Sequence, residues 1–249
     1  MMYMNEAASP ACVKYISEKY MDSYCNDLIR RFDPSVITRL HPVNIEQLLE
    51  KFLGLKIGFE NLSDDGSVLG ATVFEDDERF PVYGKNRRRP HYIAVKEGTV
   101  LCDSSLKELG SNNRYRFTLA HEAGHAIWHG AYMRAQLSAG KKSSTCLRCK
   151  SDAIRPVSDK RGKTNMPLSS IVEEQASKSA LFLLMPKDAV MKLISPMGLC
   201  LSRSDALDRI ILTAATFRVS EAAARERLLG LGLIKPGVFA GVKRKSLAV

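Results

Sequence analysis

The sequence predicts an α+β fold, and three observations carry this prediction. Apolar residues recur with helical spacing in long stretches near both ends of the chain and in its middle. Between residues 55 and 102, by contrast, the chain contains short runs rich in β-branched and aromatic residues, separated by turn-forming residues. A helical stretch with two histidines and a glutamate follows these runs. We therefore expect a small, mostly antiparallel sheet packed on helices.

Length and composition indicate a soluble protein. The chain has 249 residues, of which 45% are hydrophobic, so it can bury a core. No apolar run approaches the 18 or so residues of a membrane span, and residues 1–10 have neither the basic nor the apolar region of a secretory signal. We expect a cytoplasmic protein without a membrane partner. Its cysteines then fit free thiols better than a disulfide framework: Cys12, Cys25, Cys102, Cys146, Cys149 and Cys200.

The formal net charge of +10 could attract nucleic acid, anionic surfaces or acidic protein segments. Much of the excess lies in short runs within predicted loops or the tail, namely 85–89, 141–142, 148–150, 160–163 and 243–245. We interpret these runs as solvated loops that keep the protein soluble. A nucleic-acid surface is the alternative, so DNA binding is possible but not favoured.

Two helices open the predicted fold. Residues 11–32 keep a helical apolar stripe, which the Asp33-Pro34 pair ends. A second helix is expected over 43–53, with Asn44 as its N-cap and Gly54 as its stop.

Short strands follow these helices. We expect strands at 55–59, 68–74 and 91–95, separated by turn-forming, acidic and basic segments. Glu97-Gly98 is expected to turn a hairpin into a further strand at 99–102.

A helix over residues 114–129 contains an H-E-x-x-H match at its centre. Four residues at about 100° each bring His125 back to the face of His121, so both imidazoles can reach one metal ion. Glu122 then lies beside that ion and can take the proton of a metal-activated water. Chance or a degenerate site is the competing interpretation. Apolar residues repeat every fourth position on the other face of this segment (Leu119, Ala123 and Ile127). This repeat indicates a half-buried helix whose other face carries the histidines, which weakens the chance interpretation.

Gly124 lies inside this motif. Glycine costs about 1 kcal/mol relative to alanine within a helix, so we expect another segment to pack closely there.

Residues 130–170 show no periodic pattern, and we interpret them as an insert or mobile loop. The segment contains Cys146 and Cys149 in a C-x-x-C arrangement, which supplies only two of the four ligands of a structural zinc. A redox-sensitive or partial zinc role is one interpretation of this pair, and two loop thiols without a special role is the other.

A further helix is expected from Ser169 or Ser170 to Met185. It offers Glu173 and Glu174 as the third protein ligand that a catalytic zinc needs. Because adjacent helical residues point about 100° apart, only one of them can face the metal. The alternative is that these acids favour the helix N-terminus through its dipole.

The quoted residues resemble one family of metallopeptidases. The segments 116–125, with the H-E-x-x-H motif, 173–176, with Glu-Glu-Gln-Ala, and 183–186, with Leu-Leu-Met-Pro, are similar to the ImmA/IrrE family. The resemblance covers about residues 43–234. It implies a gluzincin-like site with His121, His125 and Glu173 as metal ligands and Glu122 as general base, and a zinc ion for which manganese could substitute. Ser177 stands where the family has Asn or Asp, a position that supports a metal-bound histidine.

The resemblance also implies a function and a division of the chain. It implies an endopeptidase that cleaves a helix-turn-helix repressor of a mobile element or stress regulon. We expect the peptide to bind in extended form along an edge strand of the sheet. The alternative is a non-catalytic antirepressor, or a DNA- or protein-binding regulator on the same scaffold. The expected parts are an N-terminal helical segment (1–40), a zincin-like domain (41–195) and a C-terminal helical pair with a basic tail (196–249).

The C-terminal pair resembles a helix-turn-helix over residues 204–234, with Ser220 capping its second helix. Arginines on that helix alternate with glutamates, which a DNA-reading helix would not favour (Arg225 and Arg227 with Glu221 and Glu226). We interpret the pair as a packing unit, with DNA or partner binding as the alternative.

Overall fold

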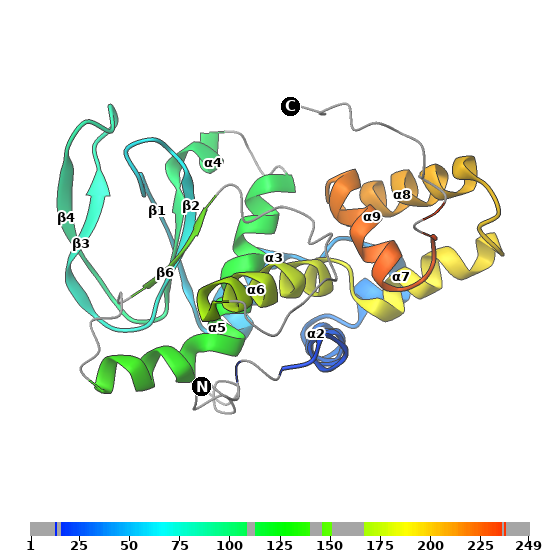
Figure 1. Cartoon of the computed structure of the whole chain (residues 1–249), viewed down its shortest axis with the longest axis horizontal. Coiled ribbons are helices and arrows are strands. Elements are labelled where there is room, and N and C mark those ends of the chain that lie inside the picture. Colours follow the sequence, from blue (N-terminus) through cyan, green and yellow to red (C-terminus); the bar gives the residue numbers. More distant parts are fainter. Residues whose placement is uncertain are drawn as a thin grey trace.

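Sheets lie at one end of the molecule and helices fill the other (Figure 1). The computed structural model describes residues 13, 16–108, 113–139, 146–150, 167–235 and 237. Within these residues the architecture is α+β, with one four-stranded and one two-stranded sheet in which most neighbouring strands are antiparallel. The predicted α+β class with mostly antiparallel strand pairing is therefore confirmed, although two sheets are present where one was expected.

The N-terminal helices follow the predicted signals. Helix α2 (Glu18–Phe32) begins at Ser17, whose side chain accepts a hydrogen bond from the Tyr20 backbone N–H, and it ends before Asp33. Ile16 and Ser17 are not helical, so the helix predicted over 11–32 does not run unbroken from residue 11 to Phe32. A short π-helical turn that the sequence did not predict, η1 (Val36–Leu40), comes next.

The second predicted helix consists of α3 (Ile45–Gln47) and η2 (Leu48–Phe52). The Asn44 side chain accepts a hydrogen bond of 3.1 Å from the Gln47 N–H, which confirms the predicted cap. Gly54 has a φ of +71° where the chain leaves the helix, so the predicted stop is confirmed as well.

The four-stranded sheet has the order β1 (Lys56–Glu60), β5 (Thr99–Asp103), β2 (Val68–Val73) and β6 (Cys146–Lys150). Strand β5 runs parallel to β1 and antiparallel to β2, and β2 is antiparallel to β6. Strand β2 is buried along its whole length because both of its faces are covered. Its Ala71 and Val73 belong to a small apolar cluster with the second sheet, while Thr72 bonds to the helix on the other face.

The second sheet pairs β3 (Asp77–Tyr83) with β4 (Pro90–Val95). The sequence analysis missed β3, because the acidic residues at 75–78 obscured the alternation of Phe80 and Val82, both of which are buried. The predicted hairpin through Glu97-Gly98 is wrong, since β4 pairs with β3 and β5 pairs with β1 and β2. Gly98 instead bonds by its backbone to Val73 and Lys56, and so passes the chain from one sheet to the other.

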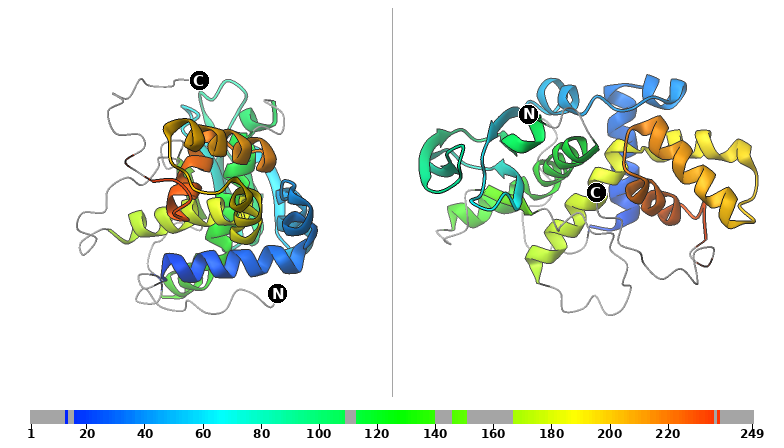
Figure 2. Two further views of the ribbon diagram at one scale, coloured as in Figure 1. Left: turned by 90° about the vertical axis from the view of Figure 1, so that its right-hand side faces the viewer. Right: turned by 90° about the horizontal axis from the view of Figure 1, so that it is seen from above.

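Two long helices lie between the sheets and the C-terminal helices (Figure 2). Helix α5 (Asn113–Ser138) follows the short α4 (Ser104–Glu108). The predicted end of α5 at His129 is wrong, because the residues after it are mostly good helix formers and Met133 is buried. Helix α6 (Leu168–Leu184) lies against α5 and ends one residue short of the predicted Met185. It begins at Leu168 after Pro167 and has no side-chain cap, so the predicted start at Ser169 or Ser170 is wrong.

The predicted insert at 130–170 is also wrong in part. Besides the last turns of α5, residues 146–150 form the edge strand β6, which the sequence analysis read as loop. Nothing in so short a polar segment marks a strand, and only pairing with β2 defines it. The backbones of Cys146 and Cys149 therefore belong to the sheet. The predictions for 140–145 and 151–166 lie outside the described residues.

The last helices among the described residues are α7 (Lys187–Ile194), η5 (Ser195–Met197), α8 (Arg203–Phe217) and α9 (Glu221–Gly230). Ser220 caps α9 as predicted, accepting from the Ala223 N–H. On α9, Arg227 is 2% exposed and donates to both carboxylate oxygens of Asp22, at 2.6 and 3.0 Å. This arginine therefore ties α9 to α2 instead of facing solvent.

One of the basic runs, 85–89, is not simply the solvated loop that the sequence predicted. In the run 85–89, Arg87 is half-buried and donates to the buried carboxylate of Asp103 at 2.6 Å, so it joins the two sheets. The runs 141–142, 160–163 and 243–245 lie outside the described residues. The described cysteines that can be assessed carry free thiols, as predicted (Cys25, Cys102 and Cys200). None of the helices in the described ranges is long and apolar enough to cross a bilayer.

Candidate metal centre

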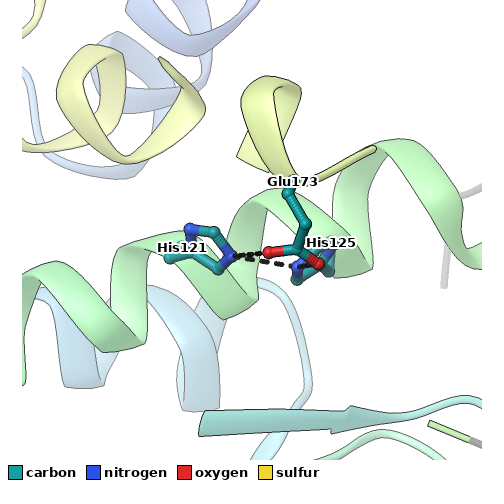
Figure 3. Close-up of side chains that lie close together, drawn as sticks. All are labelled: His121, His125 and Glu173. Atoms are coloured by element: carbon teal, nitrogen blue, oxygen red, sulfur yellow. Dashed lines mark hydrogen bonds and ion pairs between the residues drawn. The ribbon is translucent and has the colours of Figure 1, made fainter. Parts of the chain in front are cut away.

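His121, His125 and Glu173 meet between helices α5 and α6 (Figure 3). The Nε2 atoms of the two histidines, one turn apart on α5, are 3.0 Å from each other. Glu173 extends from α6 and places its two carboxylate oxygens 3.3 Å from His121 Nε2 and 3.5 Å from His125 Nε2. Both imidazoles are fully buried. The predicted ligand residues are thus brought together from two helices.

A close approach of the helices makes this meeting possible. A Cβ atom at Gly124 would lie 2.9 Å from the Ser179 Cβ and 3.1 Å from the backbone of Ala176, both on α6. Only a residue without a side chain fits there, which confirms the close packing predicted at Gly124. The approach lets a side chain as short as glutamate reach across to the histidines.

The spacing of the donor atoms suits a metal ion. Two ligand atoms at the usual zinc distances are roughly 3.3 Å apart in a tetrahedron, and the three contacts here measure 3.0, 3.3 and 3.5 Å. Oxygen Oε2 of Glu173 is buried and has no hydrogen-bond partner among the described residues. A buried carboxylate oxygen without a donor is costly, and a cation would remove that cost. The group could therefore hold a metal ion.

The neighbouring acid takes another direction. Glu174 lies 3.9 Å from the Lys178 Nζ on its own helix and does not belong to the cluster. This geometry agrees with the expectation that only one of the two glutamates faces the histidines.

Glu122 lies on the side of α5 that faces strand β2. The Thr72 hydroxyl donates a hydrogen bond of 2.6 Å to its Oε2, and a Cβ at Gly70 would lie 2.3 Å from its Oε1. Burial raises the pKa of Glu122 well above its usual value; the bond from Thr72 opposes this rise and the charge of Glu173 adds to it. A carboxylate with a raised pKa accepts a proton more readily near neutral pH, which suits a general base.

Burial favours the neutral form of His125 and His129. Burial lowers the pKa of His125 well below its usual value, and the nearby His121 and His129 lower it further. Burial likewise lowers the pKa of His129 to about 4. A neutral imidazole keeps a lone pair, which is what a metal ligand requires.

Further residues touch the histidines from outside the cluster. The Ser177 Oγ lies 3.3 Å from the Nδ1 of His121, at the position that the resemblance assigns to a histidine support. Two other contacts were not predicted from the sequence: that of His129 with His125, and that of Thr72 with Glu122. A signal existed for His129, which follows His125 by the same four residues that separate His125 from His121. No signal existed for Thr72, because its role depends on how the sheet packs on α5.

Comparisons with protein-family models and with curated proteins do not assign the site. No protein-family model matches the chain, and no curated protein matches it. Within the described residues, His121, His125 and Glu173 form the one group of ligand side chains that fits a metal. The side chains of Cys146 and Cys149 lie outside what the structure describes, so their metal or redox role stays a prediction.

Proposed function

We propose that this protein is a metal-dependent endopeptidase of the zincin type, with zinc as its metal and manganese as the closest substitute. The observation that carries the proposal is the convergence of His121, His125 and Glu173, with Glu122 buried beside them on α5. Two histidines and one carboxylate leave a coordination position open, the arrangement of catalytic rather than structural zinc sites. The resemblance to ImmA/IrrE metallopeptidases points to the same ligands.

Each residue has a role in peptide hydrolysis under this proposal. When bound, zinc supplies a Lewis acid that lowers the pKa of a water and polarises a carbonyl. His121, His125 and Glu173 would hold the ion. Glu122 would take a proton from the attacking water and transfer it to the leaving amine, and its raised pKa favours the first of these steps. Thr72 would orient the carboxylate through its hydrogen bond.

The peptide would bind in an extended form beside β6. This strand is an outer strand of the four-stranded sheet and pairs on its inner side with β2, the strand that contacts Glu122. An outer strand can pair through its backbone with an extended peptide without regard to sequence. Side-chain contacts would then select the substrate.

The proposed substrate is a helix-turn-helix repressor of a mobile element or stress regulon, as the resemblance implies. The competing function is a non-catalytic regulator that binds such a repressor or DNA, and the net charge of +10 is the observation in its favour. Arg227 weighs against DNA reading by α9, since it is buried in an ion pair with Asp22. We therefore favour the peptidase.

One substitution separates the two functions. Glu122→Gln keeps the size of the side chain and an acceptor for Thr72 but cannot take up a proton, so hydrolysis should fall roughly 10²- to 10⁴-fold. Glu174→Gln is the matched control, because Glu174 lies outside the cluster. Wild type and both variants would be incubated with a neighbouring or co-regulated repressor, with intact mass and operator binding as readouts. Relief of repression without a fragment, equally by wild type and Glu122→Gln, would show a binding antirepressor instead.

A further inference from the structure

A third buried histidine continues the row on α5. The Nδ1 of His129 lies 3.0 Å from the Nδ1 of His125, and its other nitrogen, Nε2, lies 3.0 Å from the Oε1 of Gln175 on α6. The Gln175 amide nitrogen in turn donates a hydrogen bond of 2.6 Å to the backbone carbonyl of Val13. His129 is fully buried, and both of its nitrogens are engaged by these neighbours.

The carbonyl oxygen of Val13, at the end of this series of hydrogen bonds, sets the direction of every bond in the series. A carbonyl oxygen only accepts, so the amide nitrogen of Gln175 must face Val13 and its oxygen must face His129. That oxygen also only accepts, so Nε2 of His129 carries the proton. A neutral imidazole has one donor and one acceptor, which makes Nδ1 of His129 an acceptor. Nδ1 of His125 is therefore the donor to His129.

This direction leaves His125 in the form that a metal requires. With its proton on Nδ1, His125 presents the lone pair of Nε2, and Nε2 is the atom that faces His121 and Glu173. The tautomer of His121 is not fixed in this way, because the Ser177 hydroxyl that contacts its Nδ1 can both donate and accept a hydrogen bond. The hydrogen bonds through His129 therefore fix the tautomer of the ligand His125.

We propose that His129 is a positioning residue for the metal centre, holding His125 in its metal-binding tautomer and orientation through the bonds to Gln175 and Val13. The inference rests on the proposed metal centre. It assigns no ligand role to His129, since its two nitrogens point to His125 and Gln175 and it does not belong to the ligand cluster. Acceptors behind metal-bound histidines typically contribute 10- to 100-fold to metal affinity.

A purely structural role is the competing explanation, because the bond to Gln175 also joins α5 to α6. The same two helices share another buried hydrogen bond, 2.7 Å from the Trp128 indole nitrogen to the Ser179 hydroxyl. Ser179→Ala removes that bond without touching a ligand histidine, so it is the matched control. His129→Phe keeps volume and removes the acceptor, while His129→Asn can keep an acceptor oxygen at the position of Nδ1.

The test measures zinc affinity of the full chain by competition with a chromophoric chelator, and compares the cobalt-substituted absorption spectra. We expect the zinc dissociation constant to rise about 10- to 100-fold in His129→Phe, to recover in large part in His129→Asn and to stay near wild type in Ser179→Ala. Equal affinity of His129→Phe and wild type, or an equal loss in Ser179→Ala, would overturn the proposal.

A second measurement uses the wild-type protein and avoids any variant that fails to fold. Nitrogen-15 NMR of the zinc-loaded protein should show His129 protonated on Nε2 and unprotonated on Nδ1. The opposite tautomer would contradict the hydrogen-bond directions assigned to His129, Gln175 and His125. None of these readouts uses peptide cleavage, so a protein that binds zinc as expected but cuts nothing would contradict the peptidase alone. A wild type that binds no zinc would overturn the metal centre and this inference together.

Discussion

The hydroxyl of Thr72 donates a hydrogen bond of 2.6 Å to the carboxylate of Glu122, so a buried strand holds the acid that the H-E-x-x-H motif contributes. The same hydroxyl lies 3.2 Å from the backbone carbonyl of Glu122. Strand β2 and helix α5 thereby meet at the proposed general base. Under the proposed mechanism, the contact would give the sheet a part in the chemistry besides binding the peptide.

Thr72→Val should lower the rate of cleavage and leave metal content unchanged. Valine keeps the shape of the side chain and removes the donor, and a hydrogen bond to a charged group contributes about 1.5–3 kcal/mol. We therefore expect kcat to fall roughly 10- to 100-fold. Thr72→Ser, which keeps the hydroxyl, is the control. Equal rates for Thr72→Val and wild type in steady-state kinetics would show that the bond does not orient Glu122.

Gly70→Ala should disturb the same carboxylate by steric contact. The new Cβ would lie 2.3 Å from Glu122 Oε1 and 2.9 Å from the Thr118 Cγ2, so Glu122 or the strand must move. Small-to-large changes in packed interiors cost about 1–3 kcal/mol. Gly58→Ala is the control, because its Cβ would meet only the tip of the Leu101 side chain at 2.9 Å. Unfolding in urea and cleavage assays should both show the larger loss in Gly70→Ala.

Removal of a ligand should remove the metal. Protein purified without chelator is expected to carry about one equivalent of zinc or manganese, and His121→Ala and Glu173→Ala should each lose most of it, since three protein ligands are the usual minimum of a catalytic site. Glu174→Ala should retain it, because Glu174 faces Lys178. Elemental analysis by mass spectrometry decides the matter. Metal content that is equal in His121→Ala and wild type would exclude the site.

Local signals in the sequence predicted the parts of the fold that depend on near neighbours. The Asn44 and Ser220 caps, the stop at Gly54 and the pairing of His121 with His125 each require only residues within about one helical turn. Strand β6 depends on pairing with β2, which lies far from it along the chain, and was not predicted. Strand β3 pairs with its near neighbour β4, and it was missed because the acidic residues at 75–78 obscured its alternation. Long-range pairing leaves little trace in a single short segment.

The candidate site divides in the same way. Helical spacing predicted that His121 and His125 share a face, with Glu122 beside them. It left Glu173 and Glu174 open as the third ligand, and the family resemblance pointed to Glu173, the one that lies in the cluster. The contact of Thr72 with Glu122 depends on which strand of the sheet packs on α5, and no periodicity reports that.

The buried ion pair between Arg87 and Asp103 should make stability depend on acid pH. Burial alone would raise the pKa of Asp103, but donors from Arg87, Ser105 and Leu62 together lower it below the usual value. The pair therefore contributes its full stability above about pH 4, near the unfolded pKa, and the contribution is lost as pH falls through the lower folded pKa. Asp103→Asn should cost about 1–3 kcal/mol at pH 7, and this difference from wild type should shrink below pH 4.

Urea unfolding of chelator-treated protein at several pH values measures this difference without interference from metal binding. Asp76→Asn is the control, since Asp76 pairs with Lys96 at 2.8 Å on the surface, where ion pairs contribute little. A constant difference between Asp103→Asn and wild type from pH 7 down to pH 3 would contradict the assignment.

Ser177 provides the last prediction, because it replaces the Asn or Asp of the family that the chain resembles. Its Oγ lies 3.3 Å from Nδ1 of His121, a long contact from a hydroxyl that can also donate. An amide oxygen at this position would be a stronger acceptor, whereas a carboxylate would place a third acid beside Glu122 and Glu173. Zinc affinity should therefore fall in the order Ser177→Asn, wild type, Ser177→Ala, with steps of several-fold that stay below the 10- to 100-fold limit for such contacts. Ser169→Asn makes the same change at an exposed position of α6 and should leave the affinity unchanged. A chelator competition in which Ser177→Asn, wild type and Ser177→Ala bind zinc equally would show that His121 is held without help from this side chain.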